Sequence, residues 1–258
     1  MAASECVFGL HAVDAMLRRA PARVQELRVQ EGRVDGRMQA LLDLAAQARV
    51  SVCRVARREL DAVVGDARHQ GVIAMVEPVA ALGERDLPDL LLGLEGSGTA
   101  PLLLVLDGVT DPHNLGACLR TADGAGVTAV IAPRDRAAGL TPVVRKVASG
   151  AAESVPFIQV TNLARTLDLL KEEFHLWIVG TSGEATGDLY GADLAGPTAL
   201  VLGAEGKGMR RLTMERCDAL VKLPMLGRVE SLNVSVAAGV CLYEAVRQRR
   251  IASTAPNG

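Results

Sequence analysis

Three segments of the chain carry polar residues of the kinds that bind ligands or do chemistry. The first, DPHNLGACLR at 111–120, places Asn114 near the expected start of a helix and Arg120 six residues further on. Asn114 could simply cap that helix, and Arg120 could pair with Asp123 at the i+3 position. His113 is a candidate general base, but a lone histidine after proline is more often structural. No Ser–His–Asp or Cys–His arrangement follows from the spacing.

The second segment is the glycine-rich GAEGKG at 203–208. It is not a phosphate-binding P-loop, because the required first glycine is missing and Gly208 replaces the Ser or Thr that must follow the lysine. The GxGxxG dinucleotide fingerprint is also missing after every expected strand. What remains is a turn whose backbone can approach a ligand closely, with Glu205 and Lys207 projecting. The alternative is a tight strand–helix turn with a solvated Glu–Lys pair.

The third segment, 223–251, reads as a polar loop followed by a long helix. Ser231, Asn233 and Ser235 gather at the helix entry, where such side chains cap free N–H groups. Arginines collect at the other end, where cations suit the helix dipole. Taken alone, this segment predicts an N-capped helix packed on a sheet.

The elements between these segments alternate between apolar strands and amphipathic helices. Strands are expected at 102–106, 127–131, 155–160, 176–180, 198–202 and 219–223, and helices at 115–126, 142–149, 163–174, 209–215 and from about 236. This pattern predicts an α/β fold with a mostly parallel sheet and helices on both faces. Ligands bind beyond the carboxyl ends of such strands. The loops of interest therefore begin at Asp107, Thr181, Gly203 and Pro224.

The N-terminal part predicts a separate small α/β sandwich. Helices are expected at 9–19, 36–49 and 57–64, and strands at 25–29, 50–55 and 72–76. Residues 79–100 are rich in Gly, Leu and acidic residues and predict a short helix with a flexible linker. We therefore expect an N-terminal domain at 1–78, a linker at 79–100 and a second domain at 101–258.

Composition limits the partners and the compartment. The 258 residues carry a net charge of −2 and only 2% aromatics, so a nucleic acid would need a local basic patch, and base-stacking platforms are nearly excluded. Five cysteines with no CxxC motif argue against a disulfide framework and against a zinc site. No signal core and no membrane-length apolar run is evident, so a cytoplasmic location without membrane contact is expected.

Taken together, the three segments resemble the SpoU/TrmH branch of the SPOUT RNA 2′-O-methyltransferases. The matching motifs are DPHNLG with RTA, LVLGAEGKG, and LPM with SLNVSVA, in that order. In the N-terminal part, VFGLHAV and HQGVIA resemble the L30e-like substrate-binding domain of the bacterial 23S rRNA guanosine 2′-O-methyltransferases in this family. The resemblance covers nearly the whole chain.

The resemblance implies an α/β fold whose C-terminal domain forms a deep trefoil knot, although general topology rules argue against knots. It implies S-adenosylmethionine as methyl donor and a guanosine ribose in the peptidyl-transferase P loop of 23S rRNA as acceptor. It also implies a homodimer formed through the C-terminal domain, and no metal. The residues carried over as catalytic are Arg120, Asn114, Glu205, Ser231 and Asn233. Those carried over as cofactor-binding are Gly203, Leu223, Leu232, Thr181 and Met225.

In this family an arginine is the proposed activator of the ribose hydroxyl, and Arg120 occupies that position. Arginine is effectively always protonated, so we expect its charge to stabilise the developing alkoxide rather than to remove the proton. Two other functions stay open. The substrate could be a tRNA guanosine, although the related tRNA enzymes carry short helical extensions instead of a whole N-terminal domain. The chain could also be a non-catalytic rRNA-binding protein with a degenerate knot.

Overall fold

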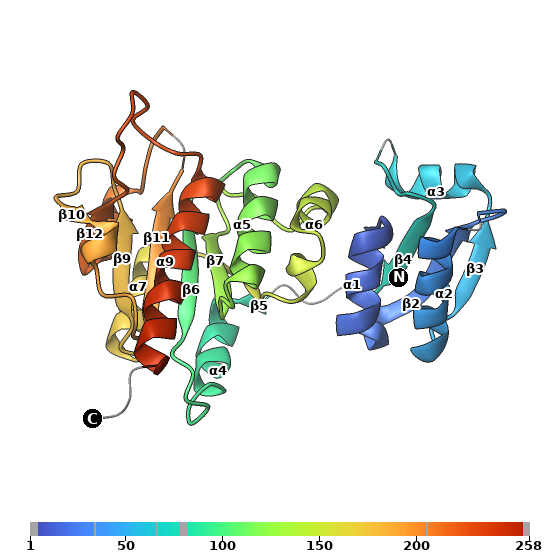
Figure 1. The fold of residues 1–258 in the computed structure, drawn as a ribbon, viewed down its shortest axis with the longest axis horizontal. Helices are drawn as coiled ribbons and strands as arrows, with labels where there is room; N and C mark the ends of the chain where they lie inside the picture. The colour runs from blue at the N-terminus through green and yellow to red at the C-terminus, as the bar shows by residue number, and fades with distance from the viewer. Residues whose placement is uncertain (1–4, 34, 66, 78–81, 205, 255–258) are drawn as a thin grey trace. The chain divides into compact units, whose positions relative to one another are not determined.

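The computed structural model describes residues 5–33, 35–65, 67–77, 82–204 and 206–254 (Figure 1). The chain forms two compact units, Met1–Ala80 with Leu140–Ser154, and Ala81–Gly139 with Val155–Gly258. Each unit has its own sheet.

The first unit contains a four-stranded sheet in the order β1-β4-β2-β3. Its strands are β1 (Glu5–Phe8), β4 (Val72–Val76), β2 (Val24–Gln30) and β3 (Val52–Val55). Alternate residues of β4 face opposite sides: Val72 and Ala74 join the core under α1 (Leu10–Arg19) and α2 (Gly36–Gln47), whereas Ile73 packs with Leu60 of α3 (Arg57–Val64). This two-sided core confirms the predicted α/β sandwich. The unit also includes α6 (Pro142–Ala148) and the turn η3 (Ala151–Glu153).

The second unit contains an eight-stranded sheet in the order β10-β12-β9-β11-β6-β7-β8-β5, and its neighbouring strands pair in parallel. The strands are β5 (Leu82–Gly83), β6 (Leu102–Asp107), β7 (Ala129–Pro133), β8 (Phe157–Val160), β9 (Trp177–Thr181), β10 (Gly187–Asp188), β11 (Thr198–Gly203) and β12 (Ala219–Lys222). Every residue of β6 and β7 is buried, as expected for strands covered on both faces. The predicted parallel α/β fold is confirmed.

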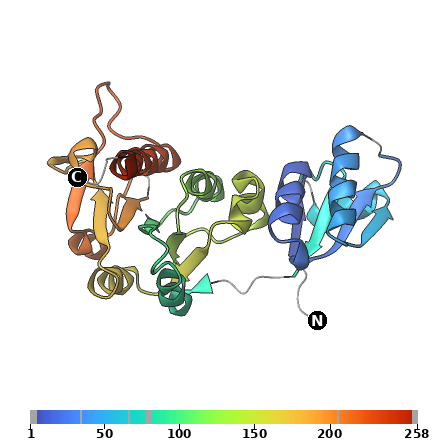
Figure 2. The ribbon, with the colours of Figure 1, turned by 60° about the horizontal axis from the view of Figure 1, so that its bottom comes forward.

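Helices cover both faces of this sheet. The face of the sheet that carries Leu103 and Val105 is covered by α4 (Leu87–Leu92) and α7 (Leu163–Glu172). On the other face, α5 (Pro112–Gly124) and α9 (Val234–Thr254) lie side by side, as Figures 1 and 2 show. The short α8 (Arg211–Arg216) follows the glycine-rich loop.

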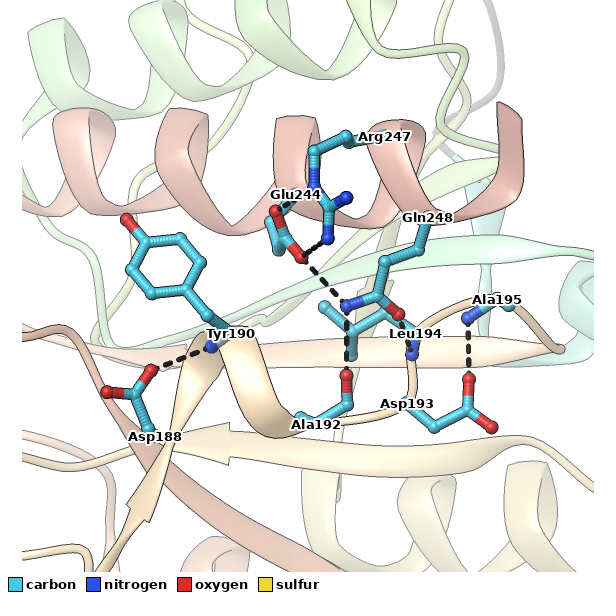
Figure 3. Close-up of polar contacts among 9 residues, drawn as sticks. All are labelled: Asp188, Tyr190, Ala192, Asp193, Leu194, Ala195, Glu244, Arg247 and Gln248. Carbon is cyan, nitrogen blue, oxygen red and sulfur yellow. Dashed lines mark hydrogen bonds and ion pairs between the residues drawn. The ribbon is translucent and has the colours of Figure 1, made fainter. Parts of the chain in front are cut away.

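The C-terminal half of α9 is anchored by a polar cluster around the buried Glu244 (Figure 3). Glu244 accepts hydrogen bonds from Nε and Nη2 of Arg247, at 2.8 and 2.7 Å, and from Nε2 of Gln248 at 2.8 Å. Gln248 in turn donates to the carbonyl oxygen of Ala192 at 2.9 Å and accepts from the N–H of Leu194 at 2.8 Å. The side chain of Gln248 therefore holds the segment before β11 against α9.

Arg249 adds a second anchor. Its guanidinium is half-buried and donates to four backbone carbonyls, those of Leu194, Ala100, Pro101 and Gly196. Ala100 and Pro101 directly precede β6, so the last helix is fastened to the start of the central strands.

Several helix boundaries differ by a few residues from those predicted, and capping side chains explain two of the helix starts. Helix α5 begins at Pro112 rather than at residue 115, because the side chain of Asp111 caps it by accepting from the N–H of His113 at 2.9 Å. Asn114 thus lies inside the first turn and is not the cap. Helix α9 begins at Val234, and Oδ1 of Asn233 accepts from the N–H of Ser235 at 2.9 Å.

The five cysteines all lie within the described residues and are not joined in disulfides. Burial raises the pKa of Cys118, Cys217 and Cys241 to about 12, so these thiols stay protonated near neutral pH and are poor nucleophiles. Among the described residues, no group of three or more His, Cys, Asp or Glu side chains could hold a metal ion. No helix in the described ranges is long and apolar enough to cross a membrane.

Candidate active site

The loops that follow four adjacent strands of the second sheet meet at the carboxyl ends of these strands. The strands β12, β9, β11 and β6 are neighbours and run in parallel, so their carboxyl ends lie together. Among the predicted residues, Thr181 ends β9, Gly203 ends β11, and Leu223 directly follows β12. Ligands of parallel α/β sheets bind at these carboxyl ends of the strands.

A direct side-chain contact joins the first and third segments. Nδ2 of Asn233 donates to Oδ1 of Asn114 at 3.0 Å, although 119 positions separate them. The same Asn233 accepts from the N–H and the hydroxyl of Ser235 through Oδ1, at 2.9 and 2.6 Å. Asn233 therefore caps α9 and contacts the first turn of α5 at once.

The glycine-rich loop that follows β11 folds back on itself. The N–H of Gly208 donates to the carbonyl of Ala204 at 2.9 Å, and the N–H of Ala204 donates to that of Gly208 at 3.2 Å. A Cβ placed on Gly203 would lie 2.1 Å from the carbonyl carbon of Gly208 and 2.2 Å from the nitrogen of Met209. Only glycine allows this close return at position 203, whereas Gly206 and Gly208 have open space around them and left-handed φ angles of +73° and +64°, which glycine adopts readily.

Asp107 is a buried carboxylate of the site that was not among the predicted residues. Its side chain is fully buried, and Oδ2 accepts from the N–H of Arg210 at 2.7 Å. Oδ1 lies 3.3 Å from Nε of Arg210, which makes an ion pair without a well-aligned hydrogen bond. Its place at the end of an otherwise apolar strand was the available sequence signal.

The other predicted catalytic residues are less closely joined. Arg120 is exposed on α5. From the rise and turn of an α-helix, its Cα lies about 9 Å along the helix axis and about 120° around it from the Cα of Asn114. The two side chains therefore point in different directions from the same helix. Ser231 is exposed in the loop before α9. Glu205 lies outside the described residues.

The remaining predicted cofactor-binding residues lie at the end of β9 and in the segment between β12 and α9. Thr181, Leu223, Met225 and Leu232 are all partly buried. Among the described residues, 224–232 make no backbone hydrogen bond to another segment. Their N–H and C=O groups are thus available to a ligand at the edge where the strands end. Thr181 itself donates from Oγ1 to the carbonyl of Val201 at 3.3 Å.

Comparison with known families identifies the class to which this fold and site belong. The model described as the SpoU rRNA Methylase family matches residues 101–243, and the one described as RNA 2′-O ribose methyltransferase substrate binding matches residues 6–81. The chain belongs to the SpoU rRNA methylase family, which confirms the resemblance found in the sequence.

Two curated relatives are similar to this chain over nearly its whole length. A protein of Pseudomonas putida named 23S rRNA (guanosine-2′-O-)-methyltransferase RlmB is 59% identical over 97% of this chain and 99% of that protein. The protein of the same name from Escherichia coli is 56% identical over 95% of this chain and 99% of that protein.

Solved structures support the same fold. The SpoU methyltransferase AviRb from Streptomyces viridochromogenes, in complex with the cofactor AdoMet, matches with a TM-score of 0.78 at 25% identity, over 97% of this chain and 92% of that one. The TrmH/SpoU tRNA modifying enzyme of A. aeolicus matches with a TM-score of 0.55 at 32% identity, over 66% of this chain and 85% of that one. The predicted methyltransferase fold with an N-terminal substrate-binding domain is confirmed, and the trefoil knot stays a prediction.

Proposed function

We propose that this chain transfers the methyl group of S-adenosylmethionine to the 2′-hydroxyl of a guanosine ribose in 23S rRNA, within the peptidyl-transferase P loop. The observation that carries the proposal is the match, at 59% identity over 97% of the chain, to a relative named for this reaction. The match includes the N-terminal unit as well as the methylase domain.

The residues at the sheet edge fit the cofactor. A nucleoside can be held by backbone N–H and C=O groups, and residues 224–232 offer such groups free of other segments within the described chain. We assign Gly203, Thr181, Leu223, Met225 and Leu232 to this role. When bound, S-adenosylmethionine supplies a methyl group activated by a positively charged sulfur.

The polar residues then act on the acceptor. Arg120 places a permanent positive charge where the 2′-oxygen becomes negative as its proton leaves, which lowers the energy of that state. The pair Asn114–Asn233, joined at 3.0 Å, orients the ribose relative to the methyl donor. Ser231 and Glu205 complete the polar set that we assign to catalysis.

The exposed position of Arg120 suits a homodimer, which we propose forms through the C-terminal domain. Helix α9 exposes Val236 and Tyr243, 51% and 54% accessible and two turns apart. Tyr243 lies near α5, because its hydroxyl would be 3.1 Å from a Cβ on Gly124. These exposed apolar side chains on α9, beside α5, are suited to contact with a second copy, which would place Arg120 at the boundary between the two chains.

We propose that the N-terminal unit binds the rRNA and that the protein acts in the cytoplasm. The relatives named for 23S rRNA cover 95–97% of this chain, whereas the tRNA modifying enzyme covers 66%. A tRNA substrate would leave the function of the N-terminal unit without an explanation. For this reason rRNA is the preferred substrate.

The test is methylation of 23S rRNA from a strain that lacks this enzyme, with labelled S-adenosylmethionine and mapping of 2′-O-methyl groups by mass spectrometry. We expect one modified guanosine in 23S rRNA, no labelling of tRNA, and loss of turnover with retained RNA binding in Arg120→Ala. Labelling of tRNA alone would contradict the rRNA assignment. Calorimetry that detects no binding of S-adenosylmethionine would favour a non-catalytic RNA-binding protein.

A further inference from the structure

Asp107 holds both ends of the glycine-rich loop. Its backbone pairs with Gly203 in the parallel ladder between β6 and β11, which fixes the start of the loop. Its Oδ2 accepts from the N–H of Arg210 at 2.7 Å, which fixes the end. Because the carboxylate is fully buried, it is costly to leave without a positive partner.

Arg210 supplies that partner and extends the connection to a third loop. Its Nε lies 3.3 Å from Oδ1 of Asp107, and its Nη2 donates to the carbonyl of Asp135, after β7, at 3.3 Å. The same Nη2 would lie 3.9 Å from a Cβ on Gly108, whose φ of +84° also favours glycine. The guanidinium therefore contacts the loops after β6 and β7 while its backbone closes the loop after β11.

We propose that Asp107 and Arg210 form a positioning pair that holds loop 203–210 in the shape that receives S-adenosylmethionine. The inference rests on the function proposed above. The pair also fixes this loop relative to the segment that leads from β6 into α5 and Asn114. A loop held in its binding shape before the ligand arrives loses less conformational entropy on binding, so the pair should act chiefly on cofactor affinity.

The chain provides a matched control at the other end of the strands of the same sheet, where their amino ends lie. Asp218 directly precedes β12, and its Oδ2 accepts from the N–H of Ile178, the second residue of β9, at 2.9 Å. Its Oδ1 pairs with Nζ of Lys171 at 2.7 Å. Asp218 thus has the same kinds of partner as Asp107, a backbone N–H and a side-chain cation, but lies at the amino ends of the strands.

The experiment compares Asp107→Asn, Arg210→Ala, Arg210→Lys and Asp218→Asn in the full-length protein. Affinity for S-adenosylmethionine is measured by calorimetry, thermal stability by the melting temperature, and steady-state kinetics with 23S rRNA as substrate. We expect Asp107→Asn and Arg210→Ala to weaken cofactor affinity about tenfold and to raise KM for the cofactor to match, with KM for rRNA unchanged. Arg210→Lys should recover part of the loss, because its ammonium can still pair with Asp107.

Asp218→Asn should lower the melting temperature while leaving cofactor affinity within about twofold of the wild type. If Asp107→Asn does not fold, Arg210→Ala decides the question, because that side chain is 45% exposed and its backbone N–H is retained. Wild-type cofactor affinity in Arg210→Ala, or an equal loss in Asp218→Asn, would overturn the positioning role. Failure of the wild type itself to bind the cofactor or to methylate rRNA would instead overturn the proposed function.

Discussion

Nδ2 of Asn233 lies 3.0 Å from Oδ1 of Asn114, and this hydrogen bond joins the first turns of two neighbouring helices. The amide of Asn233 has a fixed orientation, because its Oδ1 also accepts from the N–H of Ser235. The side chain of Asn233 therefore caps the start of α9 and links it to the first turn of α5. Asn233 therefore has a structural role as the cap of α9 and, in the function we propose, a catalytic role, and a suitable substitution can separate the two.

We expect Asn233→Asp to separate the two roles. An aspartate oxygen can still cap α9, but an ionised carboxylate cannot donate to Asn114. The melting temperature should stay close to that of the wild type, while kcat falls about a hundredfold, as is typical when a group that orients reactants is lost. Asn233→Ala should in addition lose about 1 kcal/mol of stability with the cap.

A double-mutant cycle with Asn114→Ala checks whether the two residues act as a unit. Residues that act through one shared hydrogen bond show strongly non-additive effects. The double variant should therefore be no slower than Asn233→Asp alone. Additive losses in kcat would mean that the hydrogen bond is not what matters for turnover.

Gly203→Ala should abolish cofactor binding while leaving most of the fold intact. Its Cβ would lie 2.1 Å from the carbonyl carbon of Gly208, so the returning loop must open. Gly191→Ala is the control, since a Cβ there meets nothing within 4 Å. Calorimetry with S-adenosylmethionine should show no binding for Gly203→Ala and wild-type affinity for Gly191→Ala. Retained binding in both variants would argue against the loop as part of the cofactor site.

Mixing two inactive variants tests which chain supplies Arg120. If Arg120 acts on the cofactor site of the partner, a mixed dimer of Arg120→Ala and Asn233→Asp contains one intact site. Random mixing of the two variants should then restore about a quarter of the wild-type rate. If Arg120 acts within its own chain, every site carries one defect and the mixture stays inactive.

The buried Glu244 should contribute to stability in a pH-dependent way. Hydrogen bonds from Arg247, more than any other influence, hold the pKa of Glu244 below its ordinary value of 4.5. A carboxyl group with a lowered folded-state pKa contributes stability that is present above the unfolded value and is lost as the pH falls through the folded value. Glu244→Gln should thus lose about 1–2 kcal/mol near pH 7.

The difference between Glu244→Gln and the wild type should shrink as the pH falls below 4.5. Denaturant unfolding at several pH values measures it. Arg250→Gln serves as the control, because Arg250 is exposed on the same helix and should change stability little at any pH. A loss of stability in Glu244→Gln that is independent of pH would contradict the ionic role.

Much of this fold could be predicted from the sequence because the central strands of the larger sheet are mostly apolar. The segment 102–106 is buried on both faces, and such a run has few other interpretations. The start of α5 was predicted three residues too late, because Pro112 reads equally well as the end of a loop or as a first helical residue. Strand β10 has two residues and gives no periodic pattern.

The candidate site was less predictable from the residues alone. Asn114 and Asn233 each looked like a helix cap, and only the packing of α5 beside α9 brings them together. Asp107 was missed because periodicity describes which residues are buried but not which partners they find. Its partner stands 103 positions away, and the hydrogen bond depends on the turn made by the glycine-rich loop.

The two attachments of α9 also limit when this helix can be anchored during synthesis. Asn233 at its first turn reaches α5, and Arg249 near its last turn binds the carbonyls that precede β6. A nascent chain that has already folded β6 and α5 on the ribosome still lacks both attachments. The anchoring of α9 can therefore be completed only after residue 249 has left the exit tunnel of the ribosome.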